Sequence, residues 1–589
     1  MSGDYSPALS SYPKNVYWGD THLHTRNSAD AYTYGNESLS PSDAYRYAQG
    51  EELTAHNGMR IKIKRPLDFL VVSDHAEYLG GFYELGADNP LITATAIGKK
   101  WKEWLSTGQR DKIYPSFTGS MLDPVKYPPF PKSVQSTIWE TVAKTADEFN
   151  KPGIFTAFSG YEWTSMLDRN NLHRVVIYKD SADKVSKMPP FSAQDSLDPR
   201  DLWEFLSDYE AYTGGEVIAI PHNSNLSGGM MFSDKSIDGK PINRNYAQLS
   251  ARWEPIMEVT QVKGDSETHP RLSPDDEFAD FETFDTNLGL KIADDAMLKH
   301  EYARGALKEG LRHQKNLKVN PYKFGMIGST DSHNSLVTPE EDNFFGKFVE
   351  SEPSPDRTKT KLAGGRLWEN WKISASGYAA VWAIENTRDA LFAAIKRKEV
   401  YATTGSRIRV RFFGGWNFSQ TTLDAPNFEE LGYKMGVPMG GDLSDHDGTA
   451  PGFIFSAFRD PTGANLDRVQ IIKGWLDKDG KAHEKVYDVA WAGRREVDPA
   501  TGKLPPIGST INFSEGTYDN SIGENYLSGL WVDPEFDPKL ASFYYCRVIE
   551  IPRPRWTLKD SVFFNVELAR EIPKIVQDRA YTSPIWYTP

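Results

Sequence analysis

The sequence contains a single cysteine, Cys546, in 589 residues. One cysteine excludes a disulfide within the chain and a metal site built from several thiolates. It leaves the cellular compartment open, because a periplasmic protein can also lack disulfides.

Long apolar runs are also missing. No run approaches the ~18 residues that a membrane-spanning helix requires, and the first 15 residues, MSGDYSPALSSYPKN, lack the hydrophobic region of a signal peptide. We therefore expect no membrane partner. Localisation stays open between a cytoplasmic protein and a periplasmic or secreted mature form that carries a new Met.

Basic residues are fewer than acidic ones, 67 against 81, which gives a formal net charge of −14 at pH 7. Such a surface does not favour non-specific binding to nucleic acid, so we expect no nucleic-acid partner. The 39% hydrophobic and 25% charged residues are typical of a soluble globular protein, and the length predicts two or more domains. The aromatic content of 13% fits a large core, aromatic-lined clefts or a carbohydrate-facing surface.

One short stretch near the N-terminus combines an apolar strand with side chains that bind metals. After an apolar lead-in, residues 18–24 read Trp-Gly-Asp-Thr-His-Leu-His. Because alternate residues of an extended segment point to the same face, Asp20, His22 and His24 project together. Two solvated histidines at a strand end would give the same pattern, so the triplet alone leaves both interpretations open.

The pattern of an apolar run beside an acid or a histidine recurs along the first 335 residues. These runs alternate with helix-compatible segments, which predicts an α/β fold; Ser40 and Pro41 mark one helix start. Four apolar runs are followed by an acid or a histidine: 67–73 by Asp74 and His75, 154–161 by Glu162, 216–221 by His222, and 324–329 by Asp331 and His333. A fifth run, 174–178, directly follows His173.

Six of the 12 histidines lie at these strand ends. The other six fall in polar stretches and are predicted to be surface residues: His56, His269, His300, His313, His446 and His483. The carboxyl ends of parallel strands meet at one rim of an α/β barrel, so we expect the strand-end groups to converge there. Imidazole and carboxylate suit Zn, Mn and Fe, and so many of them indicate more than one ion.

These motifs resemble those of a known family. His22-x-His24, Ser73-Asp74-His75, Glu162, His173, His222 and Asp331-Ser332-His333 resemble, in order and type, the motifs of the PHP (polymerase and histidinol phosphatase) superfamily. Residues 17–24 together with the ending 583–589 resemble the DUF3604 branch of PHP-like proteins. The resemblance implies a distorted (β/α)7 barrel over residues 15–405 that hydrolyses phosphate esters with two or three divalent metal ions, Zn, Mn or Fe.

Carried over by position, the resemblance also implies roles for single residues. One metal would be held by His22, His24, Glu162 and Asp331, with Glu162 bridging to a second metal held by His75 and His173. A third would use Asp30, His222 or His333, although Asp30 fits a loop carboxylate equally well. Asp20 and Asp74 are expected to accept the other N–H groups of the imidazoles, and Asp74 is alternatively a proton donor to the leaving group. Arg26 and Arg174 are the preferred groups for binding the anionic substrate.

The second part of the chain has mainly strand-like runs, whereas the first part alternates strands with helices. Strand-like runs separated by turn residues occupy 408–413, 452–458, 469–476, 486–491 and 543–551. They predict a β-sandwich-like C-terminal domain over residues 406–589 that packs on the barrel.

The predicted function is a divalent-metal-dependent hydrolase in which a metal-activated hydroxide attacks a phosphate mono- or diester of a small molecule. The chain has no Gly-x-Ser-x-Gly elbow after a strand and no phosphate-binding Gly-x-x-x-x-Gly-Lys-Ser/Thr loop. Long loops at 88–131, 225–241 and 329–346 are expected to select the substrate. Two alternatives stay open: hydrolysis of another ester or amide, such as a sulfate ester, and a non-catalytic carbohydrate- or partner-binding protein with structural metals. The sequence leaves the oligomeric state open.

Overall fold

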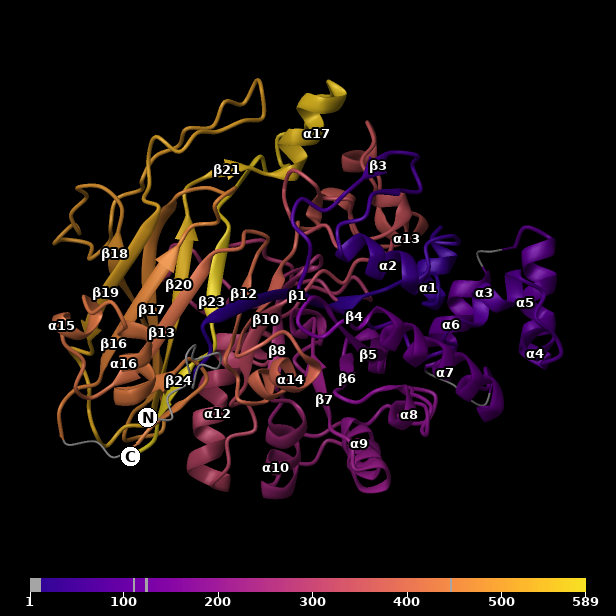
Figure 1. Ribbon diagram of the computed structural model, residues 1–589, viewed down its shortest axis with the longest axis horizontal. Helices are drawn as coiled ribbons and strands as arrows, with labels where there is room; N and C mark the ends of the chain where they lie inside the picture. The colour runs from indigo at the N-terminus through magenta and orange to yellow at the C-terminus, as the bar shows by residue number, and fades with distance from the viewer. Residues whose placement is uncertain (1–11, 110–111, 122–125, 445–447) are drawn as a thin grey trace, which may run out of the picture.

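The computed structural model describes residues 12–109, 112–121, 126–444 and 448–589 and shows a mixed α/β architecture around one large sheet (Figure 1). In spatial order its strands are β15 (Asp442–Leu443), β24 (Ile585–Tyr587), β20 (Ser542–Glu550), β23 (Arg579–Thr582), β12 (Val400–Thr403), β11 (Tyr378–Ala383), β1 (Asn15–Leu23), β4 (Phe69–Val72), β5 (Thr156–Trp163), β6 (Arg174–Tyr178) and β7 (Val217–Pro221), with β17 (Leu466–Leu476) and β18 (Ala482–Trp491) attached through β20.

Strand β1 lies in the middle of this sheet. It pairs with β4 in parallel and with β11 in antiparallel orientation, and β5 continues the sheet parallel to β4. The next two ladders, β5–β6 and β6–β7, are antiparallel. The strand that follows His173 therefore runs antiparallel to both neighbours, and its first residue lies at the same end of the sheet as the last residues of β5 and β7.

A smaller sheet consists of β10 (Gly325–Gly328), β8 (Ile256–Gln261) and β9 (Gly264–Asp265). Its strand β8 contacts β7, and its strand β10 contacts β11 and β12. Two backbone hydrogen bonds join it to the end of β1: His24 N donates to Ser332 O at 2.8 Å and Asp331 N donates to His22 O at 2.8 Å. Among the described residues the ladders do not form one continuous closed ring, so the barrel stays a prediction.

Helices from both the first and the last part of the chain accompany these sheets. The longer ones are α2 (Pro41–Ala48), α5 (Ala96–Ser106), α6 (Ile113–Ser120), α7 (Lys132–Phe149), α9 (Pro199–Thr213), α10 (Arg244–Trp253), α12 (Ala303–Leu317), α14 (Arg388–Lys396), α16 (Phe428–Met435) and α17 (Trp556–Phe564). Helix α7 packs on β5, α9 on β7, α14 on β11 and α12 on β17. Ser40 caps α2 as predicted, because its hydroxyl accepts a hydrogen bond from Asp43 N. No helix of the described residues is long and apolar enough to cross a membrane.

The large sheet crosses the predicted domain boundary at residue 405. Strand β12 pairs with β23, and β23 pairs with β20, so the ladder continues from the first part of the chain into the last. A second sheet of β14 (Gly436–Pro438), β13 (Arg409–Gly415), β16 (Gly452–Phe458) and β19 (Tyr526–Val532) packs against it. Phe453 of this sheet and Tyr544 of β20 have ring centroids 4.5 Å apart. The division into two domains stays a prediction.

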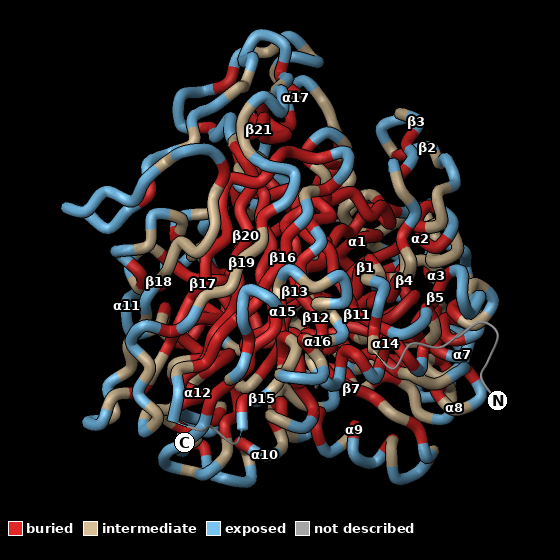
Figure 2. The backbone as a smooth tube through the Cα atoms, turned by 60° about the vertical axis from the view of Figure 1, so that its left-hand side comes forward, coloured by how far each residue is buried: buried red, intermediate tan, exposed pale blue. Residues whose placement is uncertain are grey.

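Figure 2 shows the buried backbone concentrated along the strands, with exposed segments in the peripheral loops. The prediction of surface positions was wrong for three histidines, because His269, His300 and His313 are buried. Each of them lies near an aspartate: His269 near Asp285, and the other two near Asp234. His446 lies outside the described residues.

A buried ion cluster joins α12 to β20. Arg547 of β20 donates to Asp276 Oδ1 at 2.7 Å and to Glu267 Oε2 at 3.1 Å, and Arg304 of α12 donates to Asp276 Oδ2 at 2.8 Å. Burial opposes ionisation of Asp276, but the charges of Arg547 and Arg304 outweigh it and hold the pKa of Asp276 well below its usual range. The cluster therefore ties the first part of the chain to the last through groups that water does not reach.

We expect Arg547→Met to lower the free energy of unfolding by about 3–5 kcal/mol, because it leaves buried carboxylates without part of their compensation. The matched control is Arg60→Met, which removes the exposed ion pair with Glu52 and is expected to cost less than about 1 kcal/mol. Chemical denaturation followed by tryptophan fluorescence measures both. Equal effects of the two substitutions would contradict a stabilising role for the cluster.

Candidate metal centre

The six strand-end histidines converge in one buried cluster. His22 and His24, at the end of β1, have their Nε2 atoms 3.0 Å apart. Ring centroids lie 3.9 Å apart for His24 and His333, 4.1 Å for His22 and His222, and 4.6 Å for His24 and His75. His173 completes the group, 5.7 Å from His222 and 6.2 Å from His75. Residues separated by more than 300 positions thus meet because their strands end at the same place.

Glu162 lies among these imidazoles. Its Oε1 is 2.6 Å from His173 Nδ1 and 2.7 Å from His222 Nε2, and its Oε2 is 2.9 Å from His75 Nδ1 and 3.1 Å from His24 Nε2. Its Oε2 also lies 3.6 Å from His22 Nε2, so one carboxylate lies beside five of the six rings. This is the position expected of a group that bridges two cations.

Two aspartates complete the acidic part of the cluster. Asp331 Oδ1 lies 3.4 Å from the Nε2 atoms of His22 and His24. Asp30 Oδ2 lies 3.0 Å from His333 Nε2, and its Oδ1 lies 3.4 Å from His75 Nε2. Of the two interpretations of Asp30, the structure places its carboxylate at the cluster.

The donor atoms are close enough to share ions. Three sets have ligand atoms within 4.8 Å of one another: His24, His75 and His333; His22, Glu162 and His222; and His22, His24 and Asp331. Within the described residues, His173 Nε2 and His222 Nδ1 are buried without a hydrogen-bond partner. Buried polar atoms normally have partners, so these residues fit a site that holds cations.

The electrostatics also favour cations. Burial opposes a negative charge on Glu162, but the neighbouring histidines outweigh it and hold the pKa of Glu162 well below its usual range. Burial also opposes a positive charge on His22, yet Asp331 and Glu258 raise its pKa to about 10. The negative charge around His22 thus attracts a cation, and a bound metal would displace the proton from this ring. Burial lowers the pKa of His173 to about 3, which leaves its ring in the neutral form that binds metals.

Backbone strain occurs at the cluster. Asp331 has φ 54° and Asn223, directly after His222, has φ 48°, both in the left-handed region that non-glycine residues rarely adopt. Asn223 Oδ1 accepts a hydrogen bond from Gln261 at 2.9 Å, and Gln261 also donates to Asp331 Oδ2 at 2.9 Å. The two strained segments are thus joined by one amide side chain.

Asp20 and Asp74 do not contact the imidazoles in the way the resemblance implies. Asp74 accepts hydrogen bonds from Thr25 and from the hydroxyl of Ser28, and this hydroxyl lies 2.7 Å from His24 Nδ1. Asp20 accepts from the backbone N–H of His22 and from Thr330. Both aspartates therefore orient the cluster through an intermediate group, and Asp74 does not line the cavity described below.

The two predicted anion-binding arginines lie away from the cluster. Arg174 is buried in an ion pair with Glu254 at 2.9 Å, and Arg26 stacks over Tyr83 at 3.7 Å and donates to Ser38 O. Neither lines the cavity beside the histidines. The prediction that they face the substrate was wrong, because closeness in sequence to a ligand does not fix the direction of a long side chain.

Two lysines that the sequence did not single out hold the positive charge of this cavity. Lys347 Nζ lies 3.0 Å from Asp331 Oδ1 and 3.0 Å from His333 Nδ1, and Lys263 forms an ion pair with Asp331 Oδ2. Burial lowers the pKa of Lys347 to about 8. Burial acts in the same direction on Lys263, but the charge of Asp331 outweighs it and raises its pKa.

The cavity beside these groups is small, about 50 Å³. Its lining includes the two lysines and six of the nine ligand candidates: Asp30, His75, Glu162, His173, Asp331 and His333. Seven apolar residues also line it: Phe117, Met166, Leu288, Phe348, Leu362, Leu367 and Trp368. Phe117 lies in α6, within the segment 88–131 that was predicted as a loop and that contains the helices α5 and α6. Lys347 and Phe348 directly follow the loop at 329–346. The space suits a compact anionic group, not a whole substrate.

Glu258 of β8 is a further group that the sequence did not identify. Its Oε2 lies 3.0 Å from His22 Nδ1, on the side of the ring that faces away from His24. The available signal in the sequence is an acid within the apolar run 256–259, but this run has no histidine close to its end, unlike the runs that carry the other groups.

A family described as "Protein of unknown function (DUF3604)" matches residues 11–589. None of the curated proteins matches the chain.

We expect Glu258→Gln to lower the affinity for divalent metal about tenfold or more, because a charged partner makes the coordinating imidazole more basic. Metal titration of the chelator-treated protein measures this. The matched control is Glu301→Gln: Glu301 is buried outside the cluster, burial raises its pKa to about 8, and its substitution should leave metal affinity unchanged. Equal affinities of Glu258→Gln and wild type would contradict the role of Glu258.

Proposed function

The chain belongs to the DUF3604 family, whose description names no activity, and we propose from the buried cluster that it is a metal-dependent hydrolase of phosphate mono- or diesters. The observation that carries this proposal is the buried cluster of six imidazoles and three carboxylates, which borders a small cavity through three of its histidines, its three carboxylates and two lysines. The order of the motifs further supports the finer proposal that the family is related to the PHP superfamily and shares its barrel.

The proposal assigns two or three divalent cations, Zn, Mn or Fe, to this cluster. His22, His24 and Asp331 would hold one, and Glu162 would bridge to others held by the remaining histidines and Asp30. When bound, such ions supply a nucleophile by lowering the pKa of a water molecule, and they neutralise charge on the transferring group.

The residues of the chain itself bind and orient the reacting group. Lys263 and Lys347 are compact cations that suit a phosphate oxygen. The apolar wall formed by Phe348 and Leu362 excludes water, which strengthens each charge interaction in the cavity. Glu162 and Glu258 fix the rings of the histidines before the substrate arrives, so no reorganisation is required during the reaction.

A sulfate ester is the nearest alternative substrate, because sulfate is also a tetrahedral anion that two lysines can bind. The non-catalytic alternative, a binding protein with structural metals, is less well supported. Structural metal sites are usually closed, whereas this cluster opens into a cavity that holds two cationic side chains.

We expect the purified protein to contain Zn, Mn or Fe and to hydrolyse at least one member of a panel of aryl phosphate, phosphodiester and aryl sulfate substrates. His75→Ala should lower turnover at least about 100-fold, because it removes a ligand candidate that contacts Glu162. The matched control is His483→Ala, whose histidine pairs with Asp477 in the β17–β18 turn region, and this variant should keep full activity. Elemental analysis and steady-state kinetics measure both.

The outcomes separate the alternatives. Faster turnover of the aryl sulfate than of both phosphate substrates would replace the proposed substrate class. Folded protein that binds metal but turns over none of the three would contradict the enzyme proposal.

We further expect Lys347→Met to lower kcat/KM for the phosphate substrate about 10–100-fold, because a hydrogen bond to a charged group contributes about 1.5–3 kcal/mol. Metal content should stay unchanged, since Lys347 is not a ligand candidate. Lys144→Met, which removes a surface pair with Glu140, is the control. Unchanged kcat/KM in Lys347→Met would show that this lysine does not bind the substrate.

A further inference from the structure

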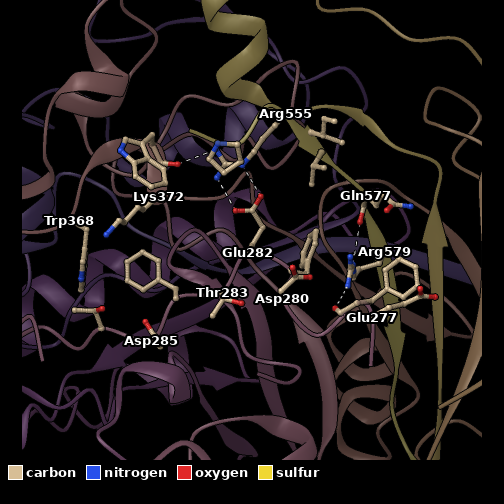
Figure 3. Close-up of a pocket in the computed structure, with 18 residues that line it drawn as sticks. Glu277, Asp280, Glu282, Thr283, Asp285, Trp368, Lys372, Arg555, Gln577 and Arg579 are labelled. Carbon is tan, nitrogen blue, oxygen red and sulfur yellow. Dashed lines mark hydrogen bonds and ion pairs between the residues drawn. The ribbon is translucent and has the colours of Figure 1, made fainter. Parts of the chain in front are cut away.

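A second, larger cavity lies on the other side of Trp368 from the metal centre. It measures about 520 Å³, a size typical of small-molecule sites. Figure 3 shows Trp368 and Asp285 on one side of it and Gln577, Arg579 and Glu277 on the other. We call it the outer cavity, and the 50 Å³ space beside the histidines the inner cavity.

The two cavities share a wall. Trp368 lines both of them, and its ring packs edge-to-face on Phe284 of the outer cavity, with centroids 4.8 Å apart. Asn225 donates one hydrogen bond to Phe284 O at 2.6 Å and one to Lys263 O at 3.1 Å. The side chain of Asn225 therefore links the backbone of the outer cavity's wall to that of a lysine in the inner cavity. This link fixes the distance between the two segments.

Most charged side chains that line the outer cavity have an oppositely charged or aromatic partner, either within the lining or outside it. Arg555 forms two hydrogen bonds with Glu282, at 2.7 and 2.8 Å, and Glu277 accepts one from Arg468 at 2.6 Å. The guanidinium of Arg579 stacks over Phe281 at 3.7 Å. A ligand that carried a strong charge of either sign would have to disrupt these pairs, so the cavity favours a neutral ligand.

The remaining chemistry of the wall is aromatic surface and neutral hydrogen-bonding groups. Trp368 and Trp371 supply indole rings, and Thr283, Thr286 and Gln577 supply hydroxyl and amide groups. Trp368 is 4% exposed, and its Nε1 is a buried donor with no hydrogen-bond partner among the described residues. A buried N–H without a partner costs free energy, so a ligand oxygen at the shared wall would satisfy it.

We propose that the outer cavity binds the alcohol part of the substrate and that this part is a sugar-like ring, with Trp368 Nε1–H donating to one of its oxygens. A sugar offers apolar C–H faces to aromatic rings and hydroxyls to neutral polar groups, which matches this wall. The inference rests on the proposed function for the reacting group, which would occupy the inner cavity. Trp368 is then a specificity-determining residue at the wall that the two cavities share.

The first test measures binding without turnover. The probes are D-glucose, D-mannose, D-galactose and D-ribose, with benzyl alcohol as an aromatic comparison, titrated against full-length His75→Ala protein by calorimetry. We expect at least one sugar to bind with millimolar affinity and Trp368→Phe in the same background to weaken it about tenfold, since the substitution keeps the ring and removes the N–H donor. Trp475→Phe, in β17 away from both cavities, is the matched control. Binding of benzyl alcohol alone, or of no probe, would overturn the proposal.

The second test measures turnover in the metal-loaded enzyme with the 6-phosphates of the three hexoses, D-ribose 5-phosphate and methyl phosphate. Trp368→Phe should lower kcat/KM about tenfold for the sugar phosphate that is the best substrate and leave methyl phosphate unchanged. If Trp368→Phe changed kcat/KM equally for the sugar phosphate and for methyl phosphate, or changed neither, the sugar-site proposal would be overturned and the hydrolase function would remain. Sugar binding in the first test without turnover of any ester would overturn the proposed function and support the outer cavity as a sugar site.

Discussion

Burial of charge at the ends of converging strands is the constraint on which this structure depends. Glu162, Asp30 and Asp331 lie in an interior where an isolated carboxylate would be strongly disfavoured. They are tolerated because imidazoles and lysines surround them at 2.6–3.4 Å. Every segment that supplies one of these groups must therefore arrive in the correct place, and the pairing of β1 with β4 and of β8 with β10 brings them there.

Buried charges with compensating partners also connect the first and the last parts of the chain. The ladder from β11 through β12 and β23 to β20 makes one sheet of segments from both halves, and the pairs of Arg304 and Arg547 with Asp276 neutralise charge beneath it. A sheet that crosses residue 405 cannot be separated there without exposing backbone hydrogen bonds. The C-terminal strands therefore support the part of the chain that carries the histidines, and Arg555 and Arg579 also reach the wall of the outer cavity.

The two adjacent cavities differ in the chemistry of their walls, so each suits a different part of a substrate. The inner one has room for a compact anion beside lysines and ligand candidates, and the outer one offers aromatic and neutral polar surface. Trp368 separates them and faces both. In the function proposed above, the inner cavity would bind the charged phosphate group, and the outer cavity would select the alcohol part of the substrate.

The sequence by itself determined the alternation of strands and helices, the cap of α2 at Ser40, and the six histidines that meet with Glu162 and Asp331, because strand periodicity and strand-end position are local properties. It left Asp30 open and did not identify Glu258. It did not determine that Arg174 pairs with Glu254, that His269 is buried, or that Lys347 reaches Asp331. Those outcomes depend on contacts between residues far apart in the chain, and a long side chain can point toward or away from a site without any change in its neighbours. Only the tertiary structure decided them, because the free energy of burying a charge depends on which partner the fold supplies.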